Sequence, residues 1–515
     1  MKIIIYFLLT FTVTLTAQQT DIVIYGGTSA GVMAAIQAAK SGKSVVLIEP
    51  GMHIGGMTSG GLSSVDKGNA AKVGGLTHEF FNRIWAYYNP TLPNTGKTMW
   101  KLEPHVAESI FNTMAAAYQV PIVYGELLNR DSGVIIDNQQ ITSIVMESGR
   151  TFSGKMFIDT SYEGDLLAAA KISHIVGRES NYTYGETLNG VLPNIKRTGT
   201  PLIDVYRTEG NPQSGFLPRI SVDQGGAPGQ GDAGVQAYTY RLCMTNVTEN
   251  SVPVTKPSDY DEINYEIVFR AIEAGIKKNQ FLKISPLHNG KVDINSGIIS
   301  TDFVGMSWTY AHVDYTSRQQ IAQQHQSWIE GLIWTLQNHP RVPSEVKDYY
   351  TPWGLAKDEF TDNNNWPPLL YVREARRMIS SVVMTEHMAM GNTPVSDGIG
   401  VATYQLDSHP VKYFIAPDGY LMIEGTFFKQ LPQPFPISYA SITPNINECT
   451  NLLAPVCLSA SHVAYGSIRM EPVFMILGQS AAVAASLAID LGVEVQNVPY
   501  TQLQTQLLNE GQILN

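Results

Sequence analysis

The first strongly patterned stretch of the chain joins a short apolar run, a glycine-rich turn and a run of small residues. It reads DIVIYGGTSAGVMAA over residues 21–35. Residues 21–25 are β-branched and apolar, which is the composition of a strand buried on both faces, and the small residues after the turn favour a helix. Residues 43–48, KSVVLI, predict a second buried strand, which Glu49 closes. The pattern therefore predicts a βαβ unit built on a parallel sheet.

The turn has the form of a dinucleotide-binding loop. Gly26 permits a tight turn, Gly31 lets the helix approach the strand closely, and the first amides of the helix would face an anion. Thr28 stands where the usual G-x-G-x-x-G motif has its middle glycine, and its hydroxyl could bond a phosphate. We therefore expect cofactor contacts along the whole turn, at Gly26, Gly27, Thr28, Ser29, Ala30 and Gly31.

Glu49 supplies the second half of this signal. It lies 18 residues after Gly31, where an acid accepts hydrogen bonds from both ribose hydroxyls of an adenosine. A carboxylate there would repel a 2′-phosphate, so NADP is disfavoured. The alternative is an ordinary βαβ unit that happens to carry a surface glutamate.

Two glycine pairs follow in HIGGMTSGGL, residues 53–62. They are Gly55–Gly56 and Gly60–Gly61. Paired glycines let the main chain lie against a flat ligand where a Cβ would clash, although a plain flexible loop has the same composition. Because the pairs come directly after the second strand, they suit a cofactor that extends beyond one βαβ unit.

The rest of the chain predicts further elements. Two helical patterns occupy residues 75–119, an antiparallel meander follows over 120–159, and long helices are expected at 315–337 and around 371–390. Residues 451–492 predict a strand, a polar loop and a small-residue helix opened by Gly478, Gln479 and Ser480. A second G-x-G-x-x-G, at Gly229, Gly231 and Gly234, follows no apolar strand and is interpreted as a loop.

Composition and charge narrow the classes of function. The net charge of −11 offers no basic stripe for nucleic acid. Residues 1–17, with Lys2 before a short apolar run and Ala17 as the cleavage point, predict a signal peptide rather than a membrane anchor, and hence an exported protein, periplasmic or secreted. We expect no later stretch to reach about 18 uncharged apolar residues, and therefore expect no membrane span in the mature chain. The sequence allows either a Cys449–Cys457 disulfide, which would leave Cys243 unpaired, or buried free thiols. No spacing of the cysteines is typical of a metal site.

These segments resemble a known group of proteins. The glycine doublet after the ribose acid is similar to the FAD-binding half of glutathione-reductase-like flavoproteins. The stretches VIYGGTSAG, HIGGMTSGGL, EPHVAE, FIDTSYEGDLLAAA, WGLAKDEF, YVREARRM and SASHVAYGSIRMEPVFMILGQSAA further resemble exported bacterial FAD-dependent oxidoreductases, some of which carry the label xanthan lyase. The resemblance covers most of residues 21–495.

The resemblance implies a fold, a cofactor and additional contacts. The fold class is α/β, with a Rossmann-like FAD-binding domain of parallel sheet and β-meander interrupted by an α+β substrate domain. The expected boundaries are 18–194 for the first part of the FAD domain, 195–440 for the insert and 441–515 for the return. FAD contacts are expected along the sheet and loop at Val123, Asp159, Gly164 and Asp165, and at Gly478–Ser480, where a helix start would face the flavin pyrimidine ring.

Redox chemistry at a flavin needs a base and groups that fix the substrate. His462, in a loop expected to approach the flavin, is the first candidate base, and His409, oriented by Asp407 or Ser408, is the second. Alternatively, His462 is a core histidine bonded to the backbone, and the segment around His409 is only a turn before Pro410. Arg373, expected to share a helical face with Arg376, would bind an acidic group unless it pairs with acids of the chain itself.

The predicted reaction is oxidation of an alcohol carbon by hydride transfer to flavin N5. A small sugar- or uronate-like substrate linked to polysaccharide breakdown is expected, because the resembling proteins accompany polysaccharide-degrading enzymes; the electron acceptor is not indicated. Two alternatives stay open: a lyase or hydratase that uses FAD structurally, and a carbohydrate-binding protein derived from a flavoenzyme.

Overall fold

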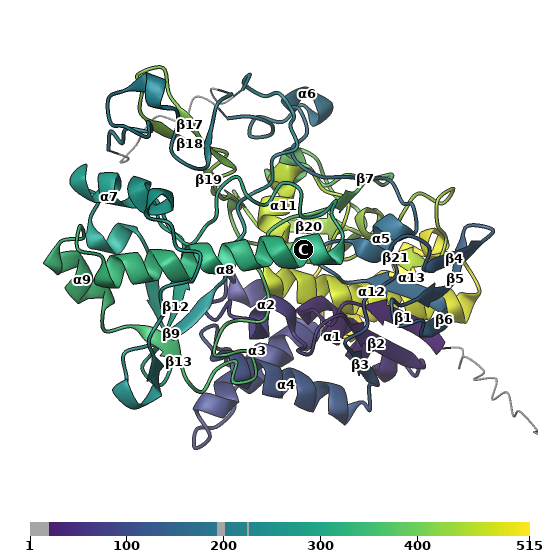
Figure 1. Ribbon diagram of the computed structural model, residues 1–515. Helices are drawn as coiled ribbons and strands as arrows, with labels where there is room; N and C mark the ends of the chain where they lie inside the picture. The colour runs from purple at the N-terminus through teal and green to yellow at the C-terminus, as the bar shows by residue number, and fades with distance from the viewer. Residues whose placement is uncertain (1–19, 193–200, 224–225) are drawn as a thin grey trace, which may run out of the picture.

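A seven-stranded sheet organises the part of the protein that Figure 1 draws on the right. The computed structural model describes residues 20–192, 201–223 and 226–515, so the predicted signal peptide lies outside the described residues. The strand order is β3-β2-β1-β6-β5-β4, and β21 adds to β6. The strands are β1 (Thr20–Tyr25), β2 (Val45–Glu49), β3 (Ile122–Tyr124), β4 (Val134–Asp137), β5 (Gln140–Val145), β6 (Thr151–Asp159) and β21 (Leu452–Leu453).

Parallel and antiparallel pairing meet on β6. Its carboxyl-terminal half pairs in parallel with β1 and β21, while its first residues pair antiparallel with β5. β2 and β3 continue the parallel part, and β4, β5 and β6 form the meander. The sequence prediction of a parallel sheet with a β-meander, and with it the α/β fold class, is therefore confirmed.

Strand β1 is buried on both sides, as its continuous apolar run predicts. Ile22 and Ile24 point into the core that contains α1 (Ser29–Lys40) and α12 (Glu471–Leu491). Val23 and Tyr25 point into a second, smaller core beneath the meander. Successive side chains of a strand face opposite sides, so a strand between two cores has to be apolar at every position.

Helix α12 begins seven residues earlier than expected, at Glu471 rather than at Gly478. The prediction that Gly478, Gln479 and Ser480 open the helix is wrong, because these polar groups find partners inside the protein. Gln479 Oε1 accepts the main-chain N–H of Leu76 at 2.9 Å, and Ser480 Oγ donates to the Ile399 carbonyl at 2.7 Å. A Cβ on Gly478 would lie 2.2 Å from the Ala30 carbonyl oxygen, so the glycine lets α12 cross α1 closely.

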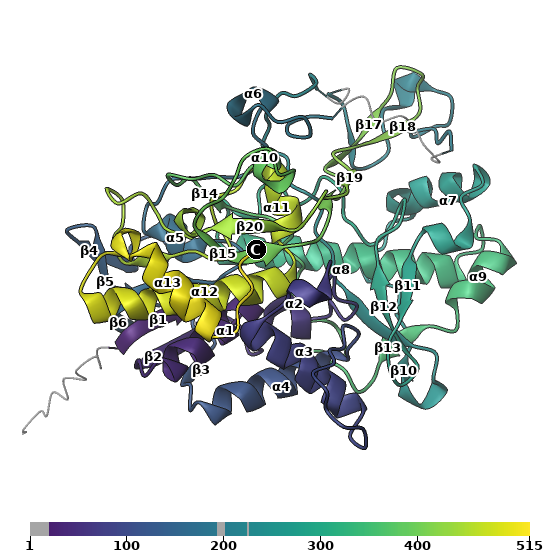
Figure 2. The same cartoon turned by 180° about the vertical axis from the view of Figure 1, so that it is seen from behind.

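Helix α12 contains an apolar stretch of a length that was not expected after residue 17, while the expectation of no membrane span in the mature chain stays a prediction. Among the described helices, it alone is long and apolar enough to cross a membrane, and 94% of its apolar window is buried inside the protein. A helix that is apolar on all sides is explained by a core position when neighbouring elements surround it. Figure 2 shows α12 between the sheet and α13 (Tyr500–Asn509).

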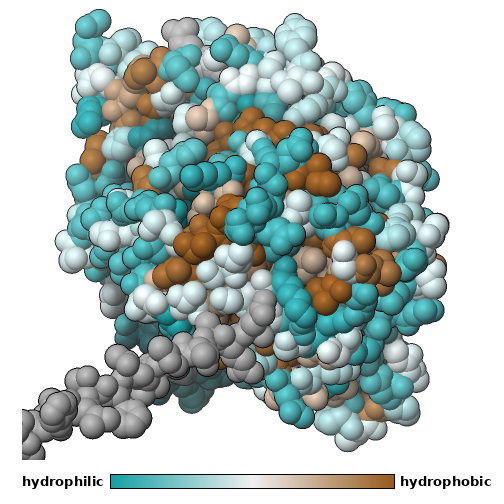
Figure 3. Space-filling view, turned by 90° about the vertical axis from the view of Figure 1, so that its right-hand side faces the viewer, coloured by the Kyte–Doolittle hydropathy of each residue, from teal (hydrophilic) through white to brown (hydrophobic). Residues whose placement is uncertain are grey.

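Several shorter helices complete the first and last parts of the chain. Those after β2 are α2 (Gly56–Ser59), α3 (Gly75–Tyr88) and α4 (Pro104–Ala117), and α5 (Asp165–Ala169) follows β6. Helix α11 (His462–Ile468) precedes α12. The two helical patterns predicted over residues 75–119 are confirmed as α3 and α4. Figure 3 looks onto the end of the molecule that carries β4 and β5, where hydrophobic patches interrupt a mainly hydrophilic surface and where Ile135 of β4 is 46% exposed.

The middle of the chain forms a five-stranded antiparallel sheet with helices beside it. The strand order is β10-β13-β9-β12-β11. The strands are β9 (Leu242–Thr245), β10 (Ser251–Val252), β11 (Lys283–Pro286), β12 (Lys291–Asn295) and β13 (Gly354–Ala356). The helices are α7 (Glu266–Glu273), α8 (Tyr315–Asn338) and α9 (Ser344–Tyr350), and α8 matches the predicted long helix at 315–337.

The long helix expected around residues 371–390 does not exist. Residues 371–384 are extended or irregular, and only α10 (Glu386–Ala389) is helical. The arginines and acids of YVREARRM are spaced like a helical face, but each is buried with a partner from another part of the chain. Arg373 bonds Asp302 and Arg376 bonds Asp165, so long-range pairing overrides the local periodicity.

Small two- and three-stranded sheets cover the remaining face. They pair β7 (His174–Ile175) with β14 (Arg377–Met378), β15 (Gly398–Ala402) with β20 (Phe435–Ser438), β16 (Leu406–Ser408) with β19 (Phe427–Lys429), and β17 (Lys412–Ile415) with both β8 (Ile220–Ser221) and β18 (Leu421–Glu424). The second glycine motif is a loop as predicted, since Gly229, Gly231 and Gly234 belong to no helix or strand. The boundary predicted at 194/195 falls outside the described residues, and the division into domains stays a prediction.

All three cysteines are buried and free. The alternative of a Cys449–Cys457 disulfide is therefore wrong. Cys457 Sγ lies against the Ser161 and Tyr162 carbonyls, at 3.5 and 3.4 Å, and burial raises the pKa of its thiol well above the usual value. These cysteines act as small apolar core residues.

Candidate functional site

A cavity of about 630 Å³ opens at the carboxyl ends of β1, β2 and β6. In an open parallel sheet, this edge is where ligands bind. The glycine turn, the end of β2 and the loop after β6 form one side, and α8 together with residues 368–370 forms the other. The lining includes Gly26, Thr28, Glu49, Gly51, His53, Gly56, Ser161, Tyr162, Glu163, Asp165, Tyr240, Tyr310, Tyr315, Arg318, Leu369 and Leu370.

Glu49 ties the end of β2 to the glycine turn. Its Oε2 accepts the main-chain N–H of Gly27 at 2.6 Å, and its Oε1 accepts that of Gly51 at 2.6 Å. Burial raises the pKa of this carboxyl to about 7, and the two backbone hydrogen bonds offset only part of that effect. The carboxylate lines the cavity at the place expected for a ribose acid.

The glycine turn is packed too tightly for side chains. Gly26 has φ +103°, and a Cβ there would lie 2.7 Å from the main-chain nitrogen of Ser161. A Cβ on Gly31 would lie 2.0 Å from the Gly26 carbonyl oxygen. The close approach of helix to strand that the sequence predicts at Gly31 is therefore present in the structure.

Thr28 has a different role from the one expected. Its hydroxyl donates to the Thr160 carbonyl at 2.8 Å and accepts the Gly31 N–H at 3.3 Å, which makes it the N-cap of α1. A hydroxyl has only one proton to donate, so this one is not free to bond a phosphate. The expectation of a phosphate contact through the Thr28 hydroxyl is wrong; the side chain instead caps the helix whose amides face the cavity.

The glycine doublets serve contacts within the chain. A Cβ on Gly55 would meet the Phe111 ring at 2.4 Å, one on Gly56 the Tyr162 hydroxyl at 2.2 Å, and one on Gly61 the Arg241 carbonyl oxygen at 2.1 Å. Gly60 lies beside Leu369. Of the four glycines, Gly56 lines the cavity.

The other expected contacts divide into two groups. Asp165 lines the cavity, and Gly164 turns the chain into α5 just before it. Asp159 does not line it: its carboxylate holds the loop after β6 through Ser161 N at 3.0 Å and Leu167 N at 2.8 Å, and burial raises its pKa to about 6. Val123 pairs with Ile48 inside the sheet. Gly478–Ser480 lie inside α12 and do not line the cavity.

His462 does not lie in a loop beside the cavity. It is the first residue of α11, is 1% exposed, and is bonded through Nδ1 to Glu374 at 2.9 Å and through Nε2 to Ser408 Oγ at 3.3 Å. Both ring nitrogens therefore have protein partners. The expectation of a loop position for this candidate base is wrong, because residues 462–468 are helical.

His409 has a more open arrangement. Its Nδ1 lies 2.8 Å from Asp302 Oδ2, its Nε2 lies 3.9 Å from Asp407 Oδ2, and 16% of its side chain is exposed. Burial, followed by the positive charge of Arg373, lowers its pKa. Asp302 orients this histidine, where the sequence had suggested Asp407 or Ser408.

Ion pairs surround His409, which does not itself line the cavity. Arg373 Nη2 bonds Asp302 Oδ1 at 2.9 Å, and Arg469 bonds Asp407 Oδ2 and the Tyr371 hydroxyl, each at 3.0 Å. Tyr371 directly follows Leu369 and Leu370, which line the cavity. In this paired cluster, Arg373 Nε, Arg469 Nε and Asp407 Oδ1 are buried without a hydrogen-bond partner.

Sequence reasoning missed Asp302, Asp407 as the partner of Arg469, and Arg318. Asp302 stands in an irregular segment, and Arg318 is one of several polar residues in the first turn of a helix. No local pattern distinguishes them. Only their partners, more than 60 positions away in sequence, give them a function.

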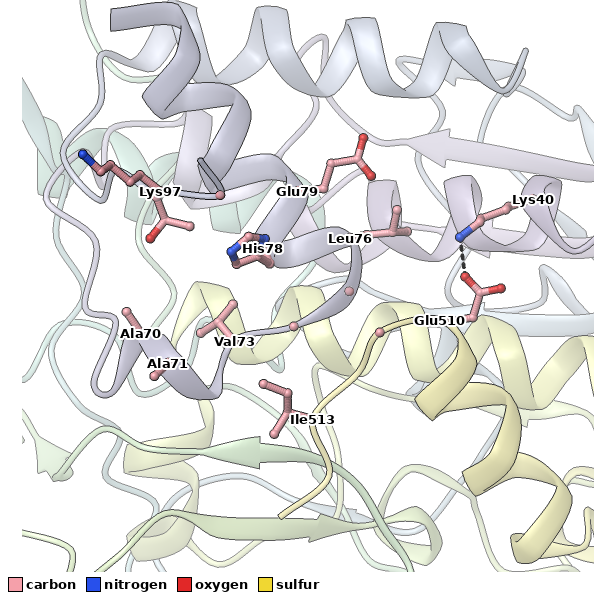
Figure 4. Close-up of a pocket in the computed structure, with 15 residues that line it drawn as sticks. Lys40, Ala70, Ala71, Val73, Leu76, His78, Glu79, Lys97, Glu510 and Ile513 are labelled. Carbon is pink, nitrogen blue, oxygen red and sulfur yellow. Dashed lines mark hydrogen bonds and ion pairs between the residues drawn. The ribbon is translucent and has the colours of Figure 1, made fainter. Parts of the chain in front are cut away.

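Two other features of the described residues resemble ligand sites. Glu103, His105 and Glu359 could hold a metal ion by their spacing, but the ammonium of Lys291 already lies 2.7 Å from Glu103 and 2.6 Å from Glu359. A cavity of about 690 Å³ lies between α3, the end of α1 and the C-terminal segment (Figure 4). The first N–H groups of α3 are used there by Gly511 and Gln479, and Lys40 pairs with Glu510, so these groups already have partners within the chain.

The fold and this site define the class: a protein with a Rossmann-like domain that binds a dinucleotide at the carboxyl edge of its sheet. The family model described as FAD dependent oxidoreductase matches residues 21–507, and the chain belongs to this family. It is an FAD-dependent oxidoreductase, as the sequence predicted. No curated protein matches the chain.

Several solved structures are similar to parts of the chain. They include the glycerol-3-phosphate dehydrogenase from Bacillus halodurans complexed with FAD (14% identity, 31% of this chain, 38% of that chain, TM-score 0.23). A second is the L-amino acid deaminase from Proteus vulgaris (17% identity, 32% of this chain, 53% of that chain, TM-score 0.23). A third is the T. acidophilum thioredoxin reductase (20% identity, 28% of this chain, 35% of that chain, TM-score 0.19). The chain thus spans 35–53% of the length of these three proteins, and similarity at this level assigns no substrate.

The residues of the cavity fit FAD. The glycine turn leaves no room for side chains at the start of α1, Glu49 presents a carboxylate acceptor, and tyrosines and leucines line the opposite end. An anionic diphosphate, ribose hydroxyls and an aromatic ring system need these three environments in turn.

Proposed function

We propose that the protein oxidises an alcohol carbon of a carbohydrate-like molecule, with His409 as the base that accepts the hydroxyl proton. The observation that carries the proposal is the Asp302–His409 pair, at 2.8 Å between Oδ2 and Nδ1. A carboxylate that accepts the Nδ1 proton holds the imidazole in the tautomer whose Nε2 is a free acceptor.

The protonation states support this role. Burial alone would raise the pKa of Asp302, but Arg373 and His409 lower it to about 2, so Asp302 stays ionised. The pKa of His409 is below its usual value, so the ring is neutral near pH 7 and its Nε2 can take a proton. FAD, when bound, accepts the hydride that leaves the carbon. The proton goes to Nε2 and the electron pair goes with the hydride, so the substrate becomes a carbonyl compound.

The charge balance around Tyr371 supports a hydroxyl-rich substrate. Three buried guanidinium groups are each neutralised by a carboxylate: Arg241 by Asp293, Arg373 by Asp302, and Arg469 by Asp407. With one acid for each arginine, little positive charge remains to select a uronate carboxylate. The unpartnered Arg373 Nε, Arg469 Nε and Asp407 Oδ1 offer both donors and an acceptor, which sugar hydroxyls can use together. A neutral sugar is therefore favoured over a uronate.

Anaerobic mixing tests the proposal. The yellow holoenzyme is mixed with neutral sugars, the matching uronates and unsaturated oligosaccharides, and bleaching of the flavin band is followed. We expect a neutral sugar to bleach the enzyme. His409→Gln should slow bleaching by about 10²–10⁴-fold, the usual contribution of a general base. Asp302→Asn should change the pH dependence of the bleaching rate more than the apparent sugar affinity.

The outcomes separate the alternatives. Bleaching at an unchanged rate in His409→Gln would overturn the assignment of the base. A substrate that is consumed while the flavin spectrum stays constant would favour a lyase or hydratase, and bleaching by a uronate alone would restore the acidic-sugar alternative. Reduction of an unsaturated oligosaccharide by pre-reduced enzyme would indicate the reverse reaction.

We also propose export to the periplasm or the medium and a link to polysaccharide breakdown. Support comes from the signal-peptide pattern of residues 1–17 and from the family resemblance. The N-terminal sequence of protein purified from a bacterial host tests export: processing should give a chain that begins at Gln18. An intact Met1 in the purified protein would contradict it.

A further inference from the structure

Helix α8 belongs to the middle of the chain, yet it forms one wall of the cavity that the glycine turn opens. Tyr315, Thr316, Arg318, Gln319 and Ala322 of α8 line the same cavity as the turn and Glu49. Figure 1 shows α8 running from α9 on the left to the middle of the molecule, toward the side that carries the seven-stranded sheet. The cofactor cavity is therefore built by two parts of the sequence that lie about 280 residues apart.

Arg318 is held rigidly in this wall. Its Nη1 and Nη2 bond the two oxygens of Asp165 at 2.6 and 2.8 Å, its Nε donates to the Tyr310 carbonyl at 2.9 Å, and Nη2 also donates to the Ala311 carbonyl at 3.1 Å. A guanidinium carries five N–H groups, and these contacts use four. One Nη1 proton therefore has no partner among the contacts of the described residues.

The charge around Asp165 is unbalanced. Arg376 Nη1 lies 3.0 Å and Arg130 Nη1 lies 3.5 Å from the same carboxylate. Glu163 is the second acid of this region; burial raises its pKa, although Arg318 and Arg376 oppose that effect. Three guanidinium groups thus face two carboxylates. We call Arg130, Arg318 and Arg376 the arginine cluster.

An uncompensated positive charge on a cavity wall is costly unless an anion enters the cavity. FAD brings a diphosphate with two negative charges, whereas the start of α1 supplies only about half an elementary charge. We propose that the arginine cluster provides the remaining countercharge, and that Arg318 is a cofactor-binding residue through which α8 holds the diphosphate of FAD. The proposal rests on FAD binding and not on the identity of the substrate.

A structural ion pair is the competing explanation, and the chain offers a matched control for it. Arg270 of α7 is also a buried helical arginine, bonded to Asp204 at 3.1 Å and Glu266 at 3.0 Å. Its side chain is 7% exposed, compared with 6% for Arg318, and it does not line the cofactor cavity. Loss of either arginine removes a buried pair, but only loss of Arg318 removes charge from the cavity.

The experiment uses deflavinated protein and three probes: FAD, ADP and adenosine. Wild type, Arg318→Gln, Arg318→Lys and Arg270→Gln are compared by quenching of flavin fluorescence, by competition with ADP or adenosine, and by circular dichroism for folding. We expect ADP to bind Arg318→Gln at least about tenfold more weakly, as for loss of a charge-assisted contact, with adenosine unchanged. Arg318→Lys should recover part of the loss, and Arg270→Gln should show none.

Equal losses for ADP and adenosine in a folded Arg318→Gln would overturn the proposal, as would unchanged ADP binding. Arg130→Gln covers the case in which Arg318→Gln does not fold, because Arg130 is more exposed, at 18%. This variant loses the 3.5 Å pair with Asp165, a bond to the Val313 carbonyl and the contact of the guanidinium with the Tyr315 ring. It should weaken ADP binding severalfold and leave adenosine binding unchanged. An unchanged ADP affinity in that variant would equally contradict the countercharge.

Discussion

The Oε2 atom of Glu49 lies 2.6 Å from the main-chain nitrogen of Gly27, so the acid at the end of β2 is bonded directly to the turn after β1. In the free chain, this buried carboxyl has its pKa raised to about 7, mainly by desolvation. Ribose hydroxyls that donate to it would stabilise its ionised form. The two ends of the predicted adenosine site are therefore linked directly to each other.

This link predicts a pH dependence of FAD binding. Because ribose hydroxyls favour the ionised carboxylate, FAD affinity should increase between about pH 6 and pH 8 in wild type. Glu49→Gln should bind FAD about tenfold more weakly at pH 8 and lose the increase. Fluorescence titration of deflavinated protein measures both effects. Equal pH profiles for wild type and variant would contradict the assignment of Glu49.

The same raised pKa predicts a dependence of the stability of the free chain on pH. The pKa of Glu49 is 4.5 in the unfolded reference and about 7 in the folded protein. Between these two pH values, the folded state therefore holds the proton on Glu49 more tightly than the unfolded state. Stability from this group is therefore full below pH 4.5 and is lost as pH rises through 7, by about 3 kcal/mol in all. Denaturant unfolding of flavin-free Glu49→Gln should have a flatter pH profile in this window than wild type.

Gly478 should be essential for the packing of α1 against α12. Gly478→Ala places a Cβ 2.2 Å from a backbone oxygen of α1, which no side-chain rotation relieves, so we expect a loss of about 3 kcal/mol. Gly492→Ala is the control: its φ is +66° but no atom lies within 4 Å, so only about 1 kcal/mol of backbone strain is expected. Thermal unfolding compares the two, and an equal loss would refute the close crossing.

The cysteines should be unreactive in the folded protein. Cys243, Cys449 and Cys457 are buried, and burial raises the pKa of each thiol. A thiol reagent such as Ellman's reagent should detect no thiol in native protein and three in denaturant without reductant. One thiol in denaturant would instead indicate a disulfide.

Lys291 should substitute for a metal between Glu103 and Glu359. Burial lowers its pKa, but the surrounding acids raise it further, so the ammonium persists. Lys291→Met leaves buried carboxylates unpaired and should cost about 3–5 kcal/mol.

Divalent ions provide the second readout for this cluster. Zinc or manganese should raise the melting temperature of Lys291→Met, because Glu103, His105 and Glu359 could then serve as ligands, and should leave wild type unchanged. Stabilisation of wild type by the same ions would show that the lysine does not occupy the place of the cation.

Elements fixed by local patterns were predicted well. Residues 22–25, directly before Gly26, are apolar at every position because both faces of the strand are buried there. The helix from Tyr315 is long and periodic, so each element could be predicted from its own residues. Gly31 and Glu49 could be recognised because their spacing reflects one turn, one helix and one strand.

Predictions that depended on distant partners failed. The spacing of Arg373 and Arg376 is helical, yet Asp302 and Asp165 hold these side chains in an extended segment. The polar residues from Gly478 onward look like a helix start, yet Gln479 reaches Leu76 and the helix continues through them. A local pattern carries no information about which buried charge or amide lies opposite, and the energy of those contacts exceeds helix propensity.

The sequence by itself determined that the chain has a βαβ dinucleotide fold with a glycine turn and a ribose acid, because these features depend on residues close in sequence. Only the tertiary structure decided that Asp302 orients His409, that His462 is enclosed by Glu374 and Ser408, and that α8 closes the cofactor cavity. Each of these depends on segments that are far apart along the chain and meet only when their side chains are buried together.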